Sequence, residues 1–188
     1  MTEFLIILGV VLLPVFAAIL SYNRFMAQRN AIDASWGGVD VELQRRHDLV
    51  PNLVETVKGY AAHEQATLQM VTEARARALE ADRDPSVGRA ELARAEDQLT
   101  AAVRTLFAVA EGYPDLKASR GFLDLQAQLV ETEDRIAAAR RLYNIEVMHY
   151  NRRIEAVPSN MIAWAFKLER REMFELRDTA HAAVPPTV

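Results

Sequence analysis

Apolar side chains recur along the chain at steps of three, four or seven positions, a pattern typical of amphipathic α-helices. We expect one helix before Pro51 and a second after it, because proline disfavours helical geometry at the preceding residue, Val50. The second helix should end in the loop sequence DRDPSVG, residues 82–88. The core-facing positions are Phe25, Ile32, Trp36, Val39, Leu43 and Val50 in the first helix, and Leu53, Val57, Tyr60, Leu68, Val71 and Leu79 in the second.

Two further helices are predicted in the C-terminal half. One covers Leu92 to Ala110 and ends at EGYPDLK, and the other runs from about Ala118 to Ala156. The apolar series of the last helix is nearly heptad over about forty residues, or about 60 Å of helix. Such a rod needs an equally long partner, either the first two helices end to end or the third helix followed by the tail. Spaced pairs such as Glu73 with Arg77 and Glu131 with Arg135 mark solvated faces.

The N-terminal segment is uniformly apolar. From Phe4 to Leu20 the sequence FLIILGVVLLPVFAAIL holds no charged or strongly polar side chain, and extension through Tyr22 would complete a membrane span. Transmembrane helices tolerate a proline such as Pro14 when neighbouring groups satisfy the freed carbonyl. A cleaved secretory signal is the competing interpretation, but Glu3 precedes the run and AAILSYNRF offers no convincing cleavage site. We therefore expect residues 4–22 to lie in the lipid bilayer as an uncleaved anchor.

Charges beside this segment predict its orientation. Arg24 and Arg29 follow the apolar run, and no Lys or Arg precedes it. The positive-inside rule then places the C-terminal bulk in the cytoplasm. The expected location is the cell (inner) membrane, crossed once. The predicted fold class is all-α, with an N-terminal transmembrane helix that continues into an elongated antiparallel four-helix bundle.

Composition excludes several functions. The length of 188 residues suits one domain with appendages: an anchor at 1–22, a bundle at 23–157, and a C-terminal amphipathic segment and disordered tail at 158–188. The net charge of −4, with both signs mixed, gives no basic stripe, so nucleic acid is not an expected partner. The chain has no cysteine, which excludes disulfides, thiolate nucleophiles and cysteine-bound metals.

The stretch RRHDLVPNLVETVKGYAAHE, residues 45–64, permits two interpretations. As a corner between helices, it would use Asp48 as the N-cap of the next helix, and its charged groups would satisfy exposed backbone and one another. As a chemical site, residues Arg45 to Asp48 would converge with His63 on a substrate or ion. The stretch lacks a nucleophile, a phosphate-binding loop and metal-ligand spacing, so the corner is favoured.

A second candidate site is EVMH, Glu146 to His149, which matches the Glu-x-x-His signature of di-iron bundles. Such centres repeat the signature on two helices, and no other histidine of this chain has a glutamate three residues before it. His149 also lies to one side of the apolar stripe of Tyr143, Val147 and Tyr150, so it should face solvent or a bundle flank. We predict no metal, cofactor or catalytic residue.

The C-terminal segment after Pro158 is rich in apolar and aromatic residues beside Arg170 and Arg171. It should form a flap that closes the end of the bundle, with Met161, Ile162, Trp164, Phe166 and Phe174 as its apolar residues. Alternatively it lies at the lipid interface, where aromatic residues with basic neighbours are favoured. The final HAAVPPTV has little to bury and is expected to be disordered.

Several of these motifs together resemble the LemA family. They are YNRF after the apolar run, RRHDLVPNLVETVKGYAAHE, YPDLKA, FLDLQAQLVETEDRIAAARRLYN and YNRRIEAVPSNMIA, extending over roughly residues 20–162. The resemblance implies an anchored bundle of long antiparallel helices and transfers no catalytic residues. A magnetosome-associated branch is tied to building membrane compartments, which implies a scaffolding or membrane-shaping role. The tail departs from the family, because WAFKLERREMF stands where relatives tend to have an FGF-like segment.

The expected function is a membrane-anchored helical scaffold that is not an enzyme. We expect it to self-associate as a homo-oligomer through its long helices, or to recruit other membrane proteins, and so to shape or organise the membrane. The alternative is a metal- or ligand-binding sensor, or an enzyme, that uses the corner at Arg45 to Asp48 or the pair Glu146 and His149.

Overall fold

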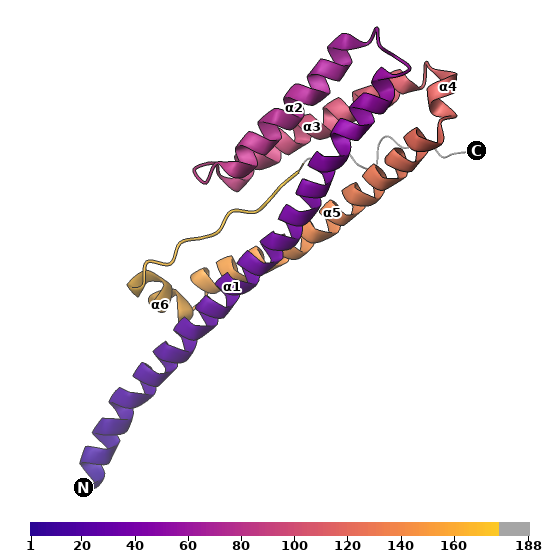
Figure 1. The fold of residues 1–188 in the computed structure, drawn as a ribbon. Coiled ribbons are helices and arrows are strands. Elements are labelled where there is room, and N and C mark those ends of the chain that lie inside the picture. Colours follow the sequence, from indigo (N-terminus) through magenta and orange to yellow (C-terminus); the bar gives the residue numbers. More distant parts are fainter. Residues whose placement is uncertain (177–188) are drawn as a thin grey trace.

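The structure is a computed structural model that describes the backbone of residues 1–176 and the side chains of residues 1–3 and 12–176. This part of the chain is all-α, as predicted, and holds no strand (Figure 1). Its helices are α1 (Thr2–Lys58), α2 (Gln65–Arg83), α3 (Arg89–Ala110), α4 (Pro114–Lys117), α5 (Arg120–Glu155) and α6 (Ser159–Ala165). The predicted disorder of HAAVPPTV lies outside the described residues.

The four long helices run alternately up and down (Figure 1). α1 and α5 pack against each other over the length of α5, while α2 and α3 form a hairpin beside their upper half. α6 lies at the lower end of α5 and also contacts α1. The long helix that packs along α5 is therefore α1. It is neither of the two predicted partners, which were two helices placed end to end and the third helix followed by the tail.

The predicted membrane anchor forms the lower end of α1. No helix of the described residues contains an apolar stretch long enough to cross a membrane. The predicted anchor at residues 4–22 falls partly outside that description, because the side chains of residues 4–11 are not described. The transmembrane anchor and the domain boundary at residue 22 stay predictions.

The predicted corner at Pro51 is wrong, because α1 continues through Pro51 to Lys58. A proline inside a helix leaves the carbonyl four residues earlier without its N–H partner, and here that carbonyl belongs to His47. Arg75 of α2 donates from Nε to this oxygen at 2.6 Å. A side chain from the neighbouring helix thus replaces the missing backbone hydrogen bond, and the helix continues.

The actual turn between the first two helices lies at residues 59–64. Gly59 donates to the carbonyl of Glu55, and Ala61 donates to the carbonyl of Val57, so the helix closes with its last carbonyls satisfied. Tyr60, predicted to face the core, is half exposed in this turn. The bounds of α3 and α5 agree with the predicted helices at 92–110 and 118–156 to within a few residues.

The core consists of two apolar clusters stacked along the bundle axis. The upper cluster holds Val50, Leu53 and Val57 of α1 together with the buried faces of α2 and α3 and the first half of α5. The lower cluster holds residues of α1 up to Leu43 and of α5 from Ile136 onward. Between them the buried side chains are charged or polar: Arg46, His47, Glu96 and Thr132.

The role of Arg75 can be tested with a double-mutant cycle. Arg75→Ala should destabilise the protein by about 2 kcal/mol, because it leaves a buried carbonyl without a donor. In a Pro51→Ala background the backbone N–H at position 51 satisfies the same carbonyl, so Arg75→Ala should cost less than about half as much. Thermal unfolding, monitored by circular dichroism in the same detergent for all variants, measures the cost of Arg75→Ala in each background.

The control for this cycle is Arg77→Ala. Arg77 lies on the same helix, is 53% exposed and is 3.9 Å from Glu73 in a surface ion pair. Its removal should change the unfolding free energy by less than about 0.5 kcal/mol. Equal costs of Arg75→Ala in the two backgrounds would show that the hydrogen bond does not substitute for the one lost at Pro51.

Candidate functional site

A layer of charged side chains crosses the middle of the bundle. Arg46 of α1 is 1% exposed and donates to the carboxylate of Glu96 on α3, to Oε1 of Glu133 on α5 at 2.7 Å, and to the hydroxyl of Thr100 at 2.9 Å. One guanidinium therefore joins α1, α3 and α5. A buried arginine is tolerated only when carboxylates and hydrogen-bond acceptors surround it, as they do here.

His47 completes this layer from the same turn of α1. Its Nε2 lies 2.9 Å from Oε1 of Glu96, and both side chains are fully buried. Burial alone would raise the pKa of Glu96, but the guanidinium of Arg46 and the contact with His47 outweigh it, so this pKa lies below its usual value. An ionised carboxylate only accepts hydrogen bonds, so His47 is the donor.

Arg46 is ionised as well. Burial opposes its charge, but the carboxylates of Glu133 and Glu96 raise its pKa above the ordinary value. Nε of Arg46 and Nδ1 of His47 have no hydrogen-bond partner among the described residues. The two fully buried charges, Arg46 and Glu96, neutralise each other inside the bundle, while Glu133 reaches the surface. The arrangement suits structural positioning better than turnover of a substrate.

The structure divides the predicted group at residues 45–48. Arg46 and His47 point into the bundle, whereas Arg45 is half exposed and lies 3.8 Å from Glu42. Asp48 is no N-cap, because it accepts a hydrogen bond from Gln44 in the middle of α1. His63 is exposed in the turn after α1. The four residues therefore do not converge with His63 on one point.

Sequence reasoning missed Glu96, although a signal was present. On α3, Leu92, Glu96 and Leu99 are separated by steps of four and three, so the glutamate occupies a core position. On α1, Arg46 lies three residues after Leu43 and four before Val50, in the same core register. Opposite charges at core positions of two helices indicate a buried pair.

The second predicted candidate, Glu146 with His149, lies on the lower half of α5. His149 is exposed, in agreement with its predicted direction, and Glu146 is half-buried. Across the residues that the structure describes, no three His, Asp or Glu side chains are placed to share a metal ion.

The C-terminal segment forms a feature that the sequence did not predict. Residues 168–176, here called the strap, leave α6 and run back along α5 in extended form (Figure 1). Asn151 accepts from the N–H and donates to the carbonyl of Arg171, at 2.9 Å each. Asn144 does the same with Phe174, at 2.9 and 3.0 Å. Each asparagine side chain thus pairs with the backbone of one strap residue.

The spacing of these pairs follows from the two geometries. Asn144 and Asn151 are two turns apart, about 10.5 Å along a helix, and Arg171 and Phe174 are three residues apart, about 10 Å along an extended chain. Tyr143 donates to the carbonyl of Glu172, and Arg140 to that of Leu176. The contacts are to main-chain atoms, so the groove recognises extended backbone. In the sequence, this groove corresponds to the dipeptide Tyr-Asn, which occurs at 143–144 and again seven residues later at 150–151.

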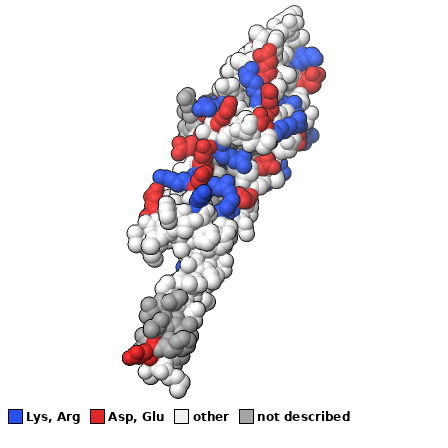
Figure 2. Space-filling view, turned by 90° about the vertical axis from the view of Figure 1, so that its left-hand side faces the viewer, with Lys and Arg blue, Asp and Glu red and all other residues white. Residues whose placement is uncertain are grey.

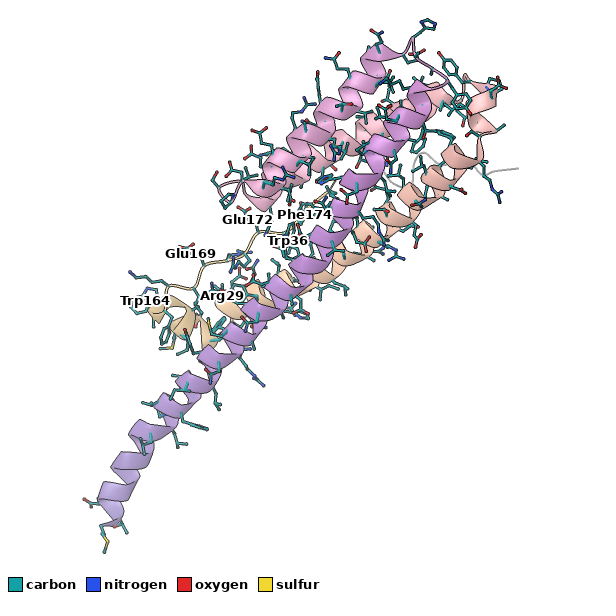
Figure 3. All side chains as sticks on the ribbon, viewed as in Figure 1. Arg29, Trp36, Trp164, Glu169, Glu172 and Phe174 are labelled. Atoms are coloured by element: carbon teal, nitrogen blue, oxygen red, sulfur yellow. The ribbon has the colours of Figure 1, made fainter. Side chains whose placement is uncertain are left out.

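Trp36 of α1 organises the upper end of this groove. Its ring meets Tyr143 and Phe174 edge to face, with centroids 5.2 Å apart in both cases (Figure 3). The guanidinium of Arg89 lies over the same ring at 3.4 Å from its centroid. Phe174 is fully buried. An aromatic cluster therefore fixes the strap between α1, α3 and α5, in the lower apolar cluster.

An open cleft of about 640 Å³ lies beside Trp36. Its carboxylates and guanidinium groups are mixed, and burial together with the nearby Asp40 raises the pKa of Asp82. The cleft separates the α2–α3 turn from the strap. Its lining comprises Ile32, Asp33, Trp36 and Asp40 of α1, residues 81–85 and 87–89 around the turn, Tyr143 of α5 and residues 170–172 of the strap.

These features define an all-α protein built on a long antiparallel helical bundle with a polar layer in its core and a C-terminal strap. The sequence profile of the LemA family matches residues 35–188, and the chain belongs to that family.

Curated relatives agree with this assignment. Magnetosome protein MamQ 2 of Paramagnetospirillum magneticum is 27% identical over 91% of this chain and 71% of its own length. Magnetosome protein MamQ of Magnetospirillum gryphiswaldense is 25% identical over 83% of this chain and 65% of its own. Protein LemA of Metamycoplasma hominis is 28% identical over 81% of this chain and 68% of its own.

Glu96 should make the protein sensitive to acid. Because its folded pKa is lower than the ordinary 4.5, its contribution to stability is complete above pH 4.5 and is lost as the pH falls through the folded value. Glu96→Gln should remove this acid-dependent loss and cost about 3 kcal/mol at neutral pH, since Arg46 stays buried with only the partly exposed Glu133 as its charge partner. Melting temperatures measured from neutral to acidic pH test both.

Two further variants complete the measurement. Arg46→Leu with Glu96→Leu removes both charges, so this pair should fold even where Glu96→Gln does not, and should also lack the acid-dependent loss. Glu131→Gln removes an exposed carboxylate that pairs with Arg135 and should leave the profile close to that of the unsubstituted protein. An unchanged acid profile in the double variant would contradict the role of Glu96.

Asn144 and Asn151 should determine how firmly the strap is held. Replacing either by Ala removes two hydrogen bonds to one strap residue, so the amides of Arg171 and Phe174 should exchange about tenfold faster with deuterium. Asn52→Ala on the exposed face of α1 is the control and should leave strap exchange unchanged. Undiminished protection of the strap in the double alanine variant would mean that the aromatic cluster alone holds it.

Proposed function

We propose that this protein is a non-catalytic scaffold, anchored in the cell membrane by residues 4–22, that self-associates or recruits partners there. The observation that carries the proposal is the continuity of α1, one helix from Thr2 to Lys58. A single helix that begins in the apolar run and ends at the far tip of the bundle transmits the orientation of an anchor to the whole domain.

The exposed side chains on lower α1 support the anchor. Leu13 is 70% exposed and Phe16 is 61% exposed, although nothing but apolar residues lies around them in sequence. Such side chains are costly in water and favourable in lipid. The positive charges at Arg24 and Arg29 then favour a single pass with a cytoplasmic bundle. The relatives named as magnetosome proteins support a membrane location for this chain.

The outer face of α5 supports self-association. Leu123, Val130, Ile145 and Met148 are each 43–47% exposed and fall within a narrow arc of the helix. They form an apolar stripe, interrupted by the exposed charges of Asp134 and Arg141, on the outside of a rod, and such a stripe suits packing against the same stripe of a second copy. Recruitment of a partner through the strap groove would require the chain's own strap to leave it, because Asn144 and Asn151 already bind Phe174 and Arg171.

The charged layer supports a structural role over catalysis. Arg46 and Glu96 are bonded to each other and closed off from solvent, so a substrate would have to open the bundle to reach them. Their position between two apolar clusters fixes the vertical register of α1, α3 and α5. The pair Glu146 and His149 lacks a second set of ligands within the described residues.

Self-association can be tested in native membranes, since the chain contains no cysteine of its own. We expect the protein to stay in the membrane pellet after a carbonate wash. A Met148→Cys variant treated there with a short bismaleimide should form a cross-linked dimer, because the proposed stripe brings two copies of α5 together. Gel mobility under denaturing conditions reads the result.

Met70→Cys on α2 is the matched control, because Met70 is 38% exposed on the opposite hairpin and should give monomer. A protein that is monomeric with cysteines at Val130 and Met148 alike, and that co-purifies with no partner, would contradict the scaffold. Release by carbonate would contradict the anchor.

A further inference from the structure

The short helix α6 presents apolar side chains on two opposite sides. Ala163 is buried and Ile162 is half-buried against the bundle, whereas Trp164 is 85% exposed and Met161 67% exposed on the other side. Val157 before the helix and Phe166 after it are also exposed, and residues 156–166 carry no charge. Packing within one chain explains only the inner side of α6.

The position of α6 relates these residues to the proposed anchor. The ring of Phe166 contacts that of Tyr22, with centroids 4.6 Å apart, so α6 lies beside α1 where the apolar run ends (Figure 1). Trp164 points away from α1 on the free side of α6 (Figure 3). On this side of the molecule, charged side chains cover the bundle and stop above an uncharged surface (Figure 2).

The charges next to α6 are predominantly basic. Residues 20–30 and 150–171, which the fold brings together, hold seven Lys or Arg and two Glu, in a chain whose net charge is −4. Burial and the nearby Arg24 lower the pKa of Arg153, which lies over the ring of Phe25. Within the described residues, neither arginine forms an ion pair. Arginines without such a pair, in segments that the fold brings next to the exposed apolar side of α6, match the headgroup region of an anionic bilayer.

We propose that Val157, Met161, Trp164 and Phe166 form a lipid platform, which inserts into the headgroup region of an anionic membrane beside the point where α1 leaves it. The proposal rests on the membrane anchor proposed above and adds a second contact with the same bilayer. One helix alone leaves a rod free to tilt and rotate about its axis. A platform to one side of that helix fixes both, so the bundle stands in a defined direction from the membrane.

The test uses three single-cysteine variants of the full chain, each carrying a nitroxide spin label, in vesicles of phosphatidylcholine and phosphatidylglycerol. Phe16→Cys reports the anchor, Met161→Cys the platform, and Val41→Cys an exposed apolar position of α1, 64% exposed, about 28 Å farther along the helix than Tyr22. Collision rates with oxygen and with a water-soluble nickel chelate measure the depth of each label. Met161→Cys retains Trp164 and Phe166, and its side chain lies outside the core.

We expect the label at position 16 to be deep in the hydrocarbon, the label at 161 at headgroup depth, and the label at 41 in water. A label at 161 as accessible to nickel as the one at 41, with position 16 in the hydrocarbon, would overturn the platform and leave the anchor intact. A label at 16 in water would overturn the anchor, and with it the platform. Circular dichroism of each variant confirms the fold.

Discussion

The buried pair of Arg46 and Glu96 is the constraint on which the arrangement of the helices depends. Apolar side chains alone allow helices to slide past each other by a turn with little penalty, because leucine packs against leucine in many registers. A buried guanidinium has one acceptable position, in which carboxylates surround it. Shifting α3 by one turn would place Arg46 against the apolar side chains above or below the layer. The layer therefore separates the two apolar clusters and aligns them.

The same turn of α1 contains the carbonyl that Pro51 leaves without its backbone hydrogen bond, and a side chain supplies the missing donor. The side chain of His47 belongs to the layer, while its carbonyl is the one that Pro51 leaves without a partner, and Arg75 supplies the donor. α1, α2 and α3 thus meet at one level through polar contacts. Since α1 continues through this level, a single helix links the apolar run at one end with the turn at 59–64 at the other.

The sequence predicted the helices well where local signals agreed. α3 and α5 have unbroken apolar periodicity and end at Gly112 with Pro114 and near Pro158, so their bounds followed from the chain itself. Pro51 misled because its local preference for ending a helix is outweighed by a contact with Arg75, which no local rule contains. Of the candidate residues at 45–48, two belong to the buried layer, but their partner Glu96 was assigned to no site.

The strap could not be predicted from hydrophobic periodicity, for a different reason. An extended segment held by side chains of a helix has no repeat of its own, and the aromatic residues of 158–174 could equally be a flap or a lipid contact. The structure divides them: Phe174 is fully buried beside Trp36, while Met161, Trp164 and Phe166 are exposed. Phe174 is thus a core residue of the strap along α5, not part of a flap over the end of the bundle, and those three side chains cover no part of the core. Only the burial of each side chain distinguishes the two interpretations, and burial depends on the whole bundle.

The two ends of the bundle differ in a way that suits attachment at one end only. From Tyr22 to Lys58, α1 rises about 54 Å, and along this length the strap, the cleft and the charged layer follow one another. At the lower end, apolar side chains and two arginines without an ion pair among the described residues, Arg24 and Arg153, gather around α1 together with the exposed pair of Glu155 and Arg170. Near the upper end of the described chain the exposed pairs Glu55 with Lys58 and Glu111 with Lys117 occur without such an apolar surface. Paired surface charges favour water and suit a tip that projects from a bilayer. The groove that binds extended backbone lies between these two ends and is occupied by the strap of the same chain.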